Sequence, residues 1–128
     1  MSAELVVKKL KKKKATLAVA ESLTGGGLGS AITDISGSSA VFFGGVIAYS
    51  DEIKIKELGV SKATLKKSSA VSEAVAIEMA EGIRKKFKST YGISTTGVAG
   101  HLERQGVGDN EHTVSRRGPE PQIGRAHV

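Results

Sequence analysis

The sequence predicts one α/β domain in three layers, with a mostly parallel or mixed sheet flanked by helices. Apolar segments of strand length alternate with segments of helical period along the first hundred residues. Two glycine-rich turns, at residues 20–27 and 96–100, each follow a strand candidate. Ligands of open α/β sheets bind at the carboxyl ends of the strands, so both turns are candidate parts of a site.

The first expected element is a helix over residues 3–14. Leu5, Val6 and Leu10 give it an apolar stripe, and a run of lysines fills its C-terminal end, where positive charge complements the helix dipole. The run contains no aromatic residue and matches no nucleic-acid-binding motif. A solvated helix end therefore explains it better than a nucleic-acid contact.

Two strands and a short helix follow. Residues 16–20 form a short buried strand, and the glycine-rich turn leads into a helix over 28–35. Residues 41–49 are apolar almost throughout, which is typical of a strand in a sheet covered on both faces.

The second half of the domain repeats this alternation. A helix capped by Ser50 or Asp51 runs to about Leu58. Ser72 caps the clearest helix, which has apolar residues at helical spacing and a basic last turn. Residues 91–95 are the third strand and run directly into the second glycine-rich turn.

The pattern changes after Gly100. Residues 101–128 contain no lysine, hold all three histidines and both prolines, and show neither strand nor helix period. We therefore divide the chain into a domain over 1–100 and a tail over 101–128. We expect the tail to be disordered, or to be an artefact of a frameshift or read-through.

Composition excludes several classes of function. The chain has 128 residues and no cysteine, which removes disulfides, thiolate metal sites and a cysteine nucleophile. No apolar run is long enough to span a bilayer, and the N-terminus lacks the apolar core of a secretory signal. We expect a cytoplasmic protein without a membrane partner. With all histidines in the tail and no carboxylate cluster, we expect neither a metal nor a cofactor.

Ser22, on the first glycine-rich turn, is the candidate nucleophile. A serine hydroxyl needs an adjacent base, and residues 1–100 contain no histidine, which leaves a Ser-Lys pair. Lys54 and Lys56 are the best-placed lysines, because they lie on the same sheet edge as Ser22 if their strands are parallel neighbours. Lys54 is nearer the strand end. Tyr49 could donate to an oxyanion or orient the lysine, or could be an amphipathic residue at the sheet rim.

The glycines of the first turn do not form a known nucleotide-binding motif. Gly25-Gly26-Gly27 has neither the spacing of a Walker A loop nor that of a dinucleotide fingerprint. Its place before a helix favours binding of an anion by backbone N–H groups, while a plain tight turn remains an alternative. The turn at residues 96–100 has the same two interpretations.

The motifs also occur in a characteristic order. They are the segments 17–26, 37–42, 44–54, 58–60, 69–73 and 96–100. Together they resemble the C-terminal domain of the competence/damage-inducible CinA family, of the PncC type that deamidates nicotinamide mononucleotide. The resemblance covers about residues 3–100.

The resemblance implies a nicotinamide-nucleotide amidase of pyridine-nucleotide recycling. Such an enzyme hydrolyses the carboxamide of nicotinamide mononucleotide to nicotinate mononucleotide and ammonia without metal or cofactor. It implies that Ser22 attacks the amide carbon, that Lys54 carries the proton, and that Tyr49 and nearby backbone N–H groups stabilise the oxyanion. The implied substrate-binding residues are Glu21, Thr24, Gly25, Gly26, Thr96 and Gly97.

The chain departs from the family pattern after Gly100. The family continues with Pro-Gly-Gly and later supplies an arginine to the phosphate, whereas here His101 follows. We therefore expect the C-terminal part of the family fold to be missing and the activity to be impaired. The alternative is a non-catalytic nucleotide- or phosphate-binding module. In both cases the expected partner is a small nucleotide rather than a nucleic acid, and a homo-oligomer is possible because family members tend to assemble.

Overall fold

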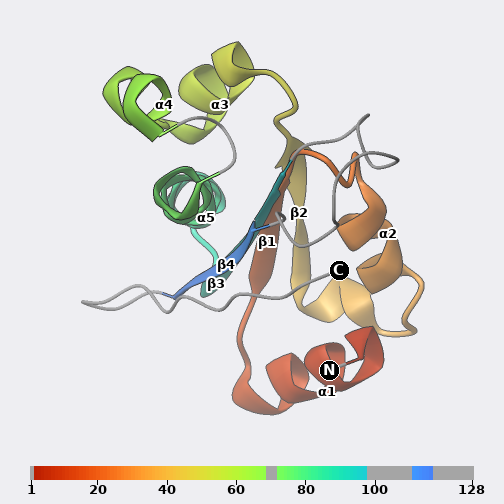
Figure 1. Ribbon diagram of the computed structural model, residues 1–128. Coiled ribbons are helices and arrows are strands. Elements are labelled where there is room, and N and C mark those ends of the chain that lie inside the picture. The colour runs from red at the N-terminus through yellow and green to blue at the C-terminus, as the bar shows by residue number, and fades with distance from the viewer. Residues whose placement is uncertain (1, 69–71, 98–110, 117–128) are drawn as a thin grey trace.

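The computed structural model describes residues 2–68, 72–97 and 111–116 and has an α/β fold (Figure 1). One mixed sheet forms the middle layer, with strand order β2-β1-β3-β4. The strands are β1 (Leu17–Glu21), β2 (Phe42–Ile47), β3 (Tyr91–Thr96) and β4 (Glu111–Arg116). The helices are α1 (Ala3–Lys13), α2 (Gly27–Thr33), α3 (Asp51–Leu58), α4 (Lys62–Ser68) and α5 (Glu73–Phe87), with a 3₁₀ turn η1 at Ser38–Ala40.

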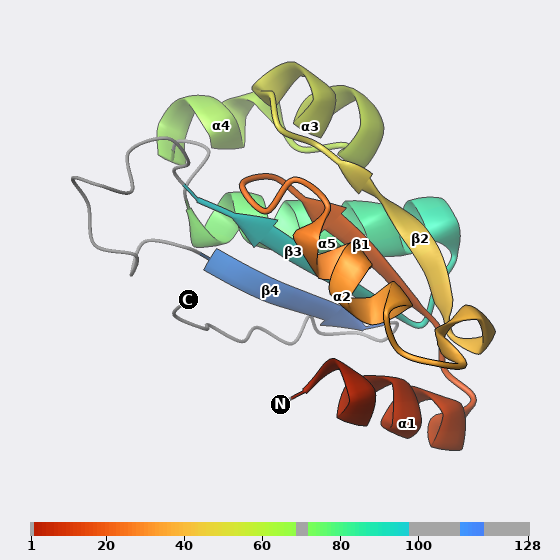
Figure 2. The same cartoon turned by 90° about the vertical axis from the view of Figure 1, so that its right-hand side faces the viewer.

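Helices cover the two faces of the sheet as separate layers (Figures 1 and 2). On one face, α1 and α2 pack against side chains of β1 through an apolar cluster that includes Leu10, Val19 and Ile32. On the other face, α3 and α5 bury a second cluster, which includes Ala20 and Met79. The α/β fold with three layers predicted from the sequence is confirmed.

Serine caps begin three of the helices, as their sequence positions indicate. The hydroxyls of Ser50 and Ser72 accept hydrogen bonds from the backbone N–H groups of Ile53 and Val75, in the first turns of α3 and α5. Gly59, with φ +70°, ends α3 in the left-handed conformation that favours glycine. The Ser50 cap determines where α3 starts relative to the end of β2.

The central strand β1 pairs in parallel with both β2 and β3. Glu21, its last residue, stands opposite Ile47 of β2 and Thr95 of β3. The carboxyl ends of the three strands therefore meet at one edge of the sheet. The first glycine-rich turn leaves the sheet at this edge, and the chain between β2 and α3 passes it as well.

The sheet is covered on both faces, as the apolar second strand indicated, but that strand itself is only partly covered. β2 is an edge strand, and alternate residues along it are exposed. The side chain of Phe43 is 53% exposed. The pairing register with β1 also passes from Phe42 to Gly44 and leaves Phe43 without a partner. An uninterrupted apolar run cannot distinguish a central strand from an edge strand. The sequence also gave no indication of α4.

The expectation that the tail lacks regular structure is wrong for six of its residues. β4 pairs antiparallel with β3, from Tyr91 opposite Arg116 to Thr96 opposite Glu111. Such pairing uses main-chain N–H and C=O groups, which every residue except proline carries, so side-chain patterns indicate it poorly. The expectations for the rest of the tail concern positions outside the described residues.

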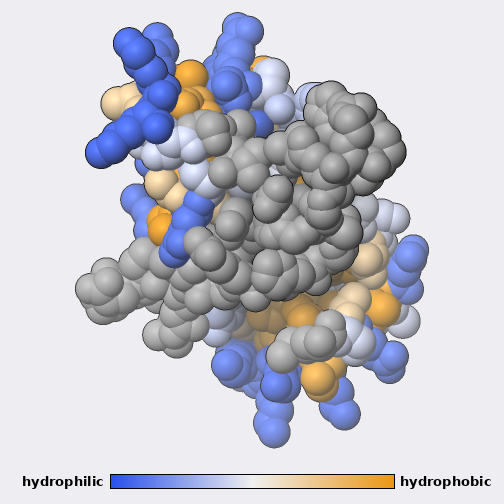
Figure 3. Space-filling model, viewed as in Figure 1, coloured by the Kyte–Doolittle hydropathy of each residue, from blue (hydrophilic) through white to orange (hydrophobic). Residues whose placement is uncertain are grey.

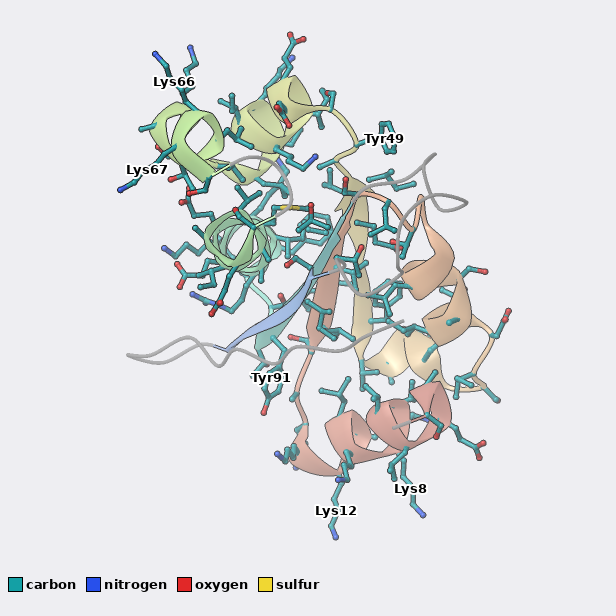
Figure 4. The ribbon with its side chains drawn as sticks, viewed as in Figure 1. Lys8, Lys12, Tyr49, Lys66, Lys67 and Tyr91 are labelled. Atoms are coloured by element: carbon teal, nitrogen blue, oxygen red, sulfur yellow. The ribbon has the colours of Figure 1, made fainter. Side chains whose placement is uncertain are left out.

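Hydrophilic side chains gather over α3 and α4 at the top of the molecule and over α1 at the bottom (Figure 3). Lys8 and Lys12 point away from α1, and Lys66 and Lys67 point away from α4 (Figure 4). This arrangement agrees with a solvated end for α1. Among the described residues, no helix has both the length and the apolar character needed to cross a membrane.

Candidate active site

Ser22 follows β1 directly and is held from both sides. Its backbone N–H donates to the carbonyl of Thr95 on β3 at 3.1 Å. The carbonyl of the preceding Glu21 accepts from the N–H of Ala48, just past β2, at 2.6 Å. Ser22 is buried, and the alternation of side chains along β1 directs its hydroxyl to the face covered by α3 and α5.

Lys54, in the middle of α3, brings its amine to this hydroxyl. The Nζ atom lies 3.3 Å from Ser22 Oγ and 2.9 Å from the carbonyl oxygen of Tyr49. The Lys54 side chain is 1% exposed, which is unusual for lysine. The structure thus brings together the two residues that the sequence analysis pairs. Lys56, the other candidate, is exposed on the same helix.

Burial changes the acid–base behaviour of this lysine. Desolvation lowers the pKa of Lys54 below its ordinary value, and the carboxylate of Asp51, 4.0 Å from Nζ, opposes that lowering. Desolvation is the larger effect, since Asp51 is largely exposed. A lowered pKa raises the fraction of neutral amine near neutral pH, and the neutral amine is the form that can take a proton from Ser22.

Tyr49 contributes through its main chain. Its side chain is 64% exposed and points away from the molecule (Figure 4). Its carbonyl oxygen is the atom that contacts Lys54. The lysine is therefore oriented by Tyr49 without use of the phenol, and the phenol makes no hydrogen bond within the described part of the chain. A role of this hydroxyl at an oxyanion stays a prediction.

The glycine-rich turn folds around the carboxylate of Glu21. Gly25 and Gly26 have φ of +58° and +109°, a conformation that favours glycine. The side chain of Glu21 is 2% exposed. Its two oxygens accept hydrogen bonds from Thr24 Oγ1 and from the backbone N–H groups of Gly26, Leu28 and Gly29.

Some backbone N–H groups of the turn donate hydrogen bonds within the described residues and others do not. Gly26 donates to Glu21, and Gly25 donates to the carbonyl of Ser22 at 3.1 Å. Among the described residues, the N–H groups of Leu23 and Thr24 have no hydrogen-bond partner. These two amides follow Ser22 directly. They are therefore better placed to bind an oxyanion than those of Gly25 and Gly26.

Three threonines complete the surroundings. Thr24 Oγ1 lies 2.8 Å from Oγ1 of Thr95, a contact the sequence analysis missed. Because Thr95 and Thr96 alternate on β3, Thr96 faces the Ser22 side of the sheet, where it is fully buried. Gly97 follows at the strand end and is half-buried. The parallel register of β1 with β3 was the information needed to find Thr95.

The edge of the sheet thus carries two polar groups on opposite faces. Ser22 and Lys54 form a nucleophile–base pair on the α3 and α5 face. Glu21, Thr24 and Thr95 form a hydrogen-bonded network on the α2 face. In the described segments, no three His, Asp or Glu side chains are grouped so that they could hold a metal ion.

Comparisons with known proteins find relatives over 73% and 77% of this chain. A CinA-like protein of Synechococcus sp. is 55% identical over 98 residues, which are 77% of this chain and 24% of that protein. A protein of Halothermothrix orenii whose name describes it as competence-damage inducible is 56% identical over 93 residues, 73% of this chain and 22% of that protein. The chain thus spans less than a quarter of the length of these relatives.

The fold itself is also found among solved structures. A crystal structure of a competence-damaged protein (CinA) superfamily member from Escherichia coli matches with a TM-score of 0.88 at 29% identity, covering 98% of this chain and 74% of that chain. The family model described as the CinA C-terminal domain matches residues 1–110. This match reaches past residue 100, where the sequence analysis ends the domain. The chain belongs to the CinA C-terminal domain family.

Proposed function

We propose that this domain hydrolyses the carboxamide of nicotinamide mononucleotide, giving nicotinate mononucleotide and ammonia. The observation that carries the proposal is the 3.3 Å contact between the hydroxyl of Ser22 and the buried amine of Lys54. A hydroxyl beside a desolvated amine is an activated nucleophile suited to acyl transfer. Family membership and the resemblance to the PncC type supply the choice of substrate.

The first half of the reaction forms an acyl-enzyme. Neutral Lys54 takes the proton of Ser22 Oγ as that oxygen attacks the amide carbon. The carbonyl oxygen becomes an oxyanion, which the N–H groups of Leu23 and Thr24 stabilise. Lys54 then returns the proton to the amide nitrogen, the C–N bond breaks, and ammonia leaves.

The second half restores the enzyme. A water molecule gives a proton to Lys54 and attacks the ester carbon of the acyl-enzyme. The bond to Ser22 Oγ then breaks, the proton returns to Ser22, and nicotinate mononucleotide leaves. Throughout, the carbonyl of Tyr49 keeps the amine of Lys54 directed at Ser22.

The setting proposed for this reaction is pyridine-nucleotide recycling in the cytoplasm. The partner is a small nucleotide rather than a nucleic acid or a membrane. Its proposed contacts near this sheet edge are Thr24, Gly25, Gly26, Thr96 and Gly97. Self-association of the chain is part of this proposal and is open to measurement by light scattering.

The test is ammonia release from nicotinamide mononucleotide by the purified chain. Ser22→Ala and Lys54→Met should each lower kcat by about a thousandfold or more, as removal of a nucleophile or its base does in related mechanisms. Lys56→Met is the matched control, because Lys56 is exposed on the same helix, and it should keep full activity.

The same variants separate a lost reaction from lost folding. Lys54→Met replaces a buried amine by an apolar side chain of similar length. The free energy of unfolding of this variant at neutral pH should therefore be between that of the parent and a value about 1 kcal/mol higher. Full activity in Ser22→Ala would refute the mechanism. A parent chain that neither binds nicotinamide mononucleotide nor releases ammonia from it would refute the substrate.

A second candidate is a binding module for nucleotide or phosphate groups without catalysis. The amides of Leu23 and Thr24, which have no hydrogen-bond partner in the described part of the chain, favour it, because adjacent backbone N–H groups bind anions. Calorimetric binding of nicotinamide mononucleotide by the parent chain, with no ammonia release, would select this candidate over the enzyme.

A further inference from the structure

Glu21 is a buried acidic side chain that pairs with no basic side chain among the described residues. It is among the largest fully buried side chains, and no lysine or arginine of the described chain forms an ion pair with it. A buried carboxylate is costly unless hydrogen bonds replace its water. The proposed reaction uses Ser22 and Lys54 and leaves this group without a chemical step.

Protein hydrogen-bond donors replace the water that the Glu21 carboxylate loses on burial. Oε1 accepts from Thr24 Oγ1 at 2.6 Å, from Gly26 N at 3.2 Å and from Leu28 N at 2.8 Å. Oε2 accepts from Gly29 N at 2.8 Å. All four donors come from the segment that follows Ser22, so the carboxylate ties this whole segment to the end of β1. Hydrogen bonds to a charged acceptor are the strong kind.

The same contacts use most of the carboxylate's capacity as an acceptor. Oε1 accepts three hydrogen bonds from protein donors and Oε2 accepts one. It also lies on the α2 face of the sheet, whereas the hydroxyl of Ser22 lies on the α3 and α5 face. The geometry of Glu21 therefore does not favour contact with a substrate bound at Ser22.

The hydrogen bonds of Glu21 determine which amides of the turn have no partner. Because Thr24 Oγ1 and Gly26 N both donate to Glu21, the backbone between Ser22 and Gly26 is fixed. In this conformation the N–H groups of Leu23 and Thr24 have no partner among the described residues. Thr24 is held a second time by Thr95 on the neighbouring strand. Donors that are fixed before the reaction stabilise an oxyanion without the cost of reorganisation.

We propose that Glu21 is a positioning residue, whose buried carboxylate holds the turn after Ser22 so that the amides of Leu23 and Thr24 stay directed at the developing oxyanion. The proposal rests on the proposed acyl-transfer function of Ser22. The positioning role takes the place of the substrate-binding role that the resemblance implies for Glu21. Its effect belongs to the transition state, since the oxyanion exists only there.

The test substitutes Glu21→Gln. Glutamine keeps the size of the side chain, but one acceptor oxygen becomes an NH₂ group that must face a backbone N–H. Glu4→Gln, an exposed carboxylate on α1, is the matched control. For nicotinamide mononucleotide, kcat should fall by about ten- to a hundredfold in Glu21→Gln, as small displacements of catalytic groups do, with KM within about twofold. A substrate-binding residue would instead raise KM.

A probe of Ser22 makes this result independent of the substrate. A fluorophosphonate reacts with an activated serine: Ser22 Oγ bonds to phosphorus, fluoride leaves, and Lys54 takes the proton. The rate of Ser22 labelling, followed by mass spectrometry, should fall at least tenfold in Glu21→Gln and stay unchanged in Glu4→Gln. Hydrogen exchange at the amides of Gly26, Leu28 and Gly29 should speed up in Glu21→Gln, with the rest of β1 unaffected.

The outcomes separate the two proposals. Labelling of Ser22 at the parental rate in Glu21→Gln would overturn the positioning role, and so would a parent chain whose Ser22 does not react. A selective rise in KM would return Glu21 to substrate binding. A parent chain that is labelled at Ser22 but releases no ammonia from nicotinamide mononucleotide would refute only the proposed substrate.

Discussion

At the residue scale, the buried amine of Lys54 shows how a surface-type side chain becomes a base. Its polar contacts within hydrogen-bond distance are a hydroxyl and a carbonyl, on Ser22 and Tyr49, and neither carries a charge. The nearest carboxylate, on Asp51, is at 4.0 Å and mostly in solvent. Burial therefore dominates and lowers the pKa of Lys54.

The pH dependence of activity should reveal this balance. Lys54 acts as a base when neutral, so activity rises as pH rises through its pKa. The charge of Asp51 raises that pKa, and Asp51→Asn should therefore move the acidic limb of the kcat/KM profile to lower pH. The displacement should shrink in high salt, because Asp51 is exposed.

Glu52→Gln serves as the control for Asp51→Asn. Glu52 is exposed in the same first turn of α3, so its loss removes a similar interaction with the helix dipole. Its profile should match that of the parent. An acidic limb that stays in place or moves to higher pH in Asp51→Asn would contradict the assignment of Lys54 as the base.

At the scale of elements, α3 and α5 approach each other so closely that a side chain at the crossing has no room. A Cβ atom at Gly82 of α5 would collide with the backbone carbonyl of Leu58, the last residue of α3. This contact helps to set the position of α3, and α3 carries Lys54. The glycine inside a helix is therefore explained by packing rather than by helix propensity.

Gly82→Ala tests packing against propensity. Alanine favours a helix over glycine by about 1 kcal/mol, yet the collision should lower the free energy of unfolding by about 1–3 kcal/mol. The measurement is urea denaturation followed by circular dichroism. Gly27→Ala in α2 is the control, since its new Cβ would lie 3.9 Å from Thr24 Cβ, an ordinary contact. A more stable Gly82→Ala variant would show that α3 can move away without cost.

At the scale of the whole molecule, the mixed sheet depends on a strand that the sequence does not reveal. β3 lies between β1 and β4, and its residues from Ser94 to Thr96 are buried. β4 pairs with all six residues of β3 and covers the main-chain groups on that side. Without β4, β3 would become a second exposed edge beside β2.

Shortened chains test the contribution of β4. A chain that ends at residue 110 should melt at least about 5 °C below the parent and should self-associate, because the edge of β3 becomes available for pairing. A chain that ends at residue 116 keeps every described element and is the control. Differential scanning calorimetry and light scattering give the two readouts. Equal melting temperatures for all three chains would mean that β4 adds nothing to stability.

The sequence predicted those parts that local chemistry determines. Serine caps and helical spacing gave α3 and α5, and the absence of histidine from residues 1–100 left lysine as the base, which the parallel strands then bring to Ser22. The contact of Thr95 with Thr24 was missed because it depends on strand register. The hydrogen bonds of the Glu21 carboxylate were missed because they depend on the path of the glycine-rich turn. The edge position of β2 and the pairing of β4 depend on strand order and main-chain bonding, which side-chain patterns do not encode.

The contact between Ser22 and Lys54 joins residues only 32 positions apart, within the unit from β1 through α2 and β2 to α3. During synthesis this unit emerges from the ribosome before β3 does, so the two reactive groups can meet early. The carbonyl of Thr95, which holds the backbone of Ser22, is added about forty residues after Lys54. Nucleophile and base thus belong to the half of the domain that is synthesised first. The half that is synthesised later supplies the hydrogen bond that holds the backbone of Ser22.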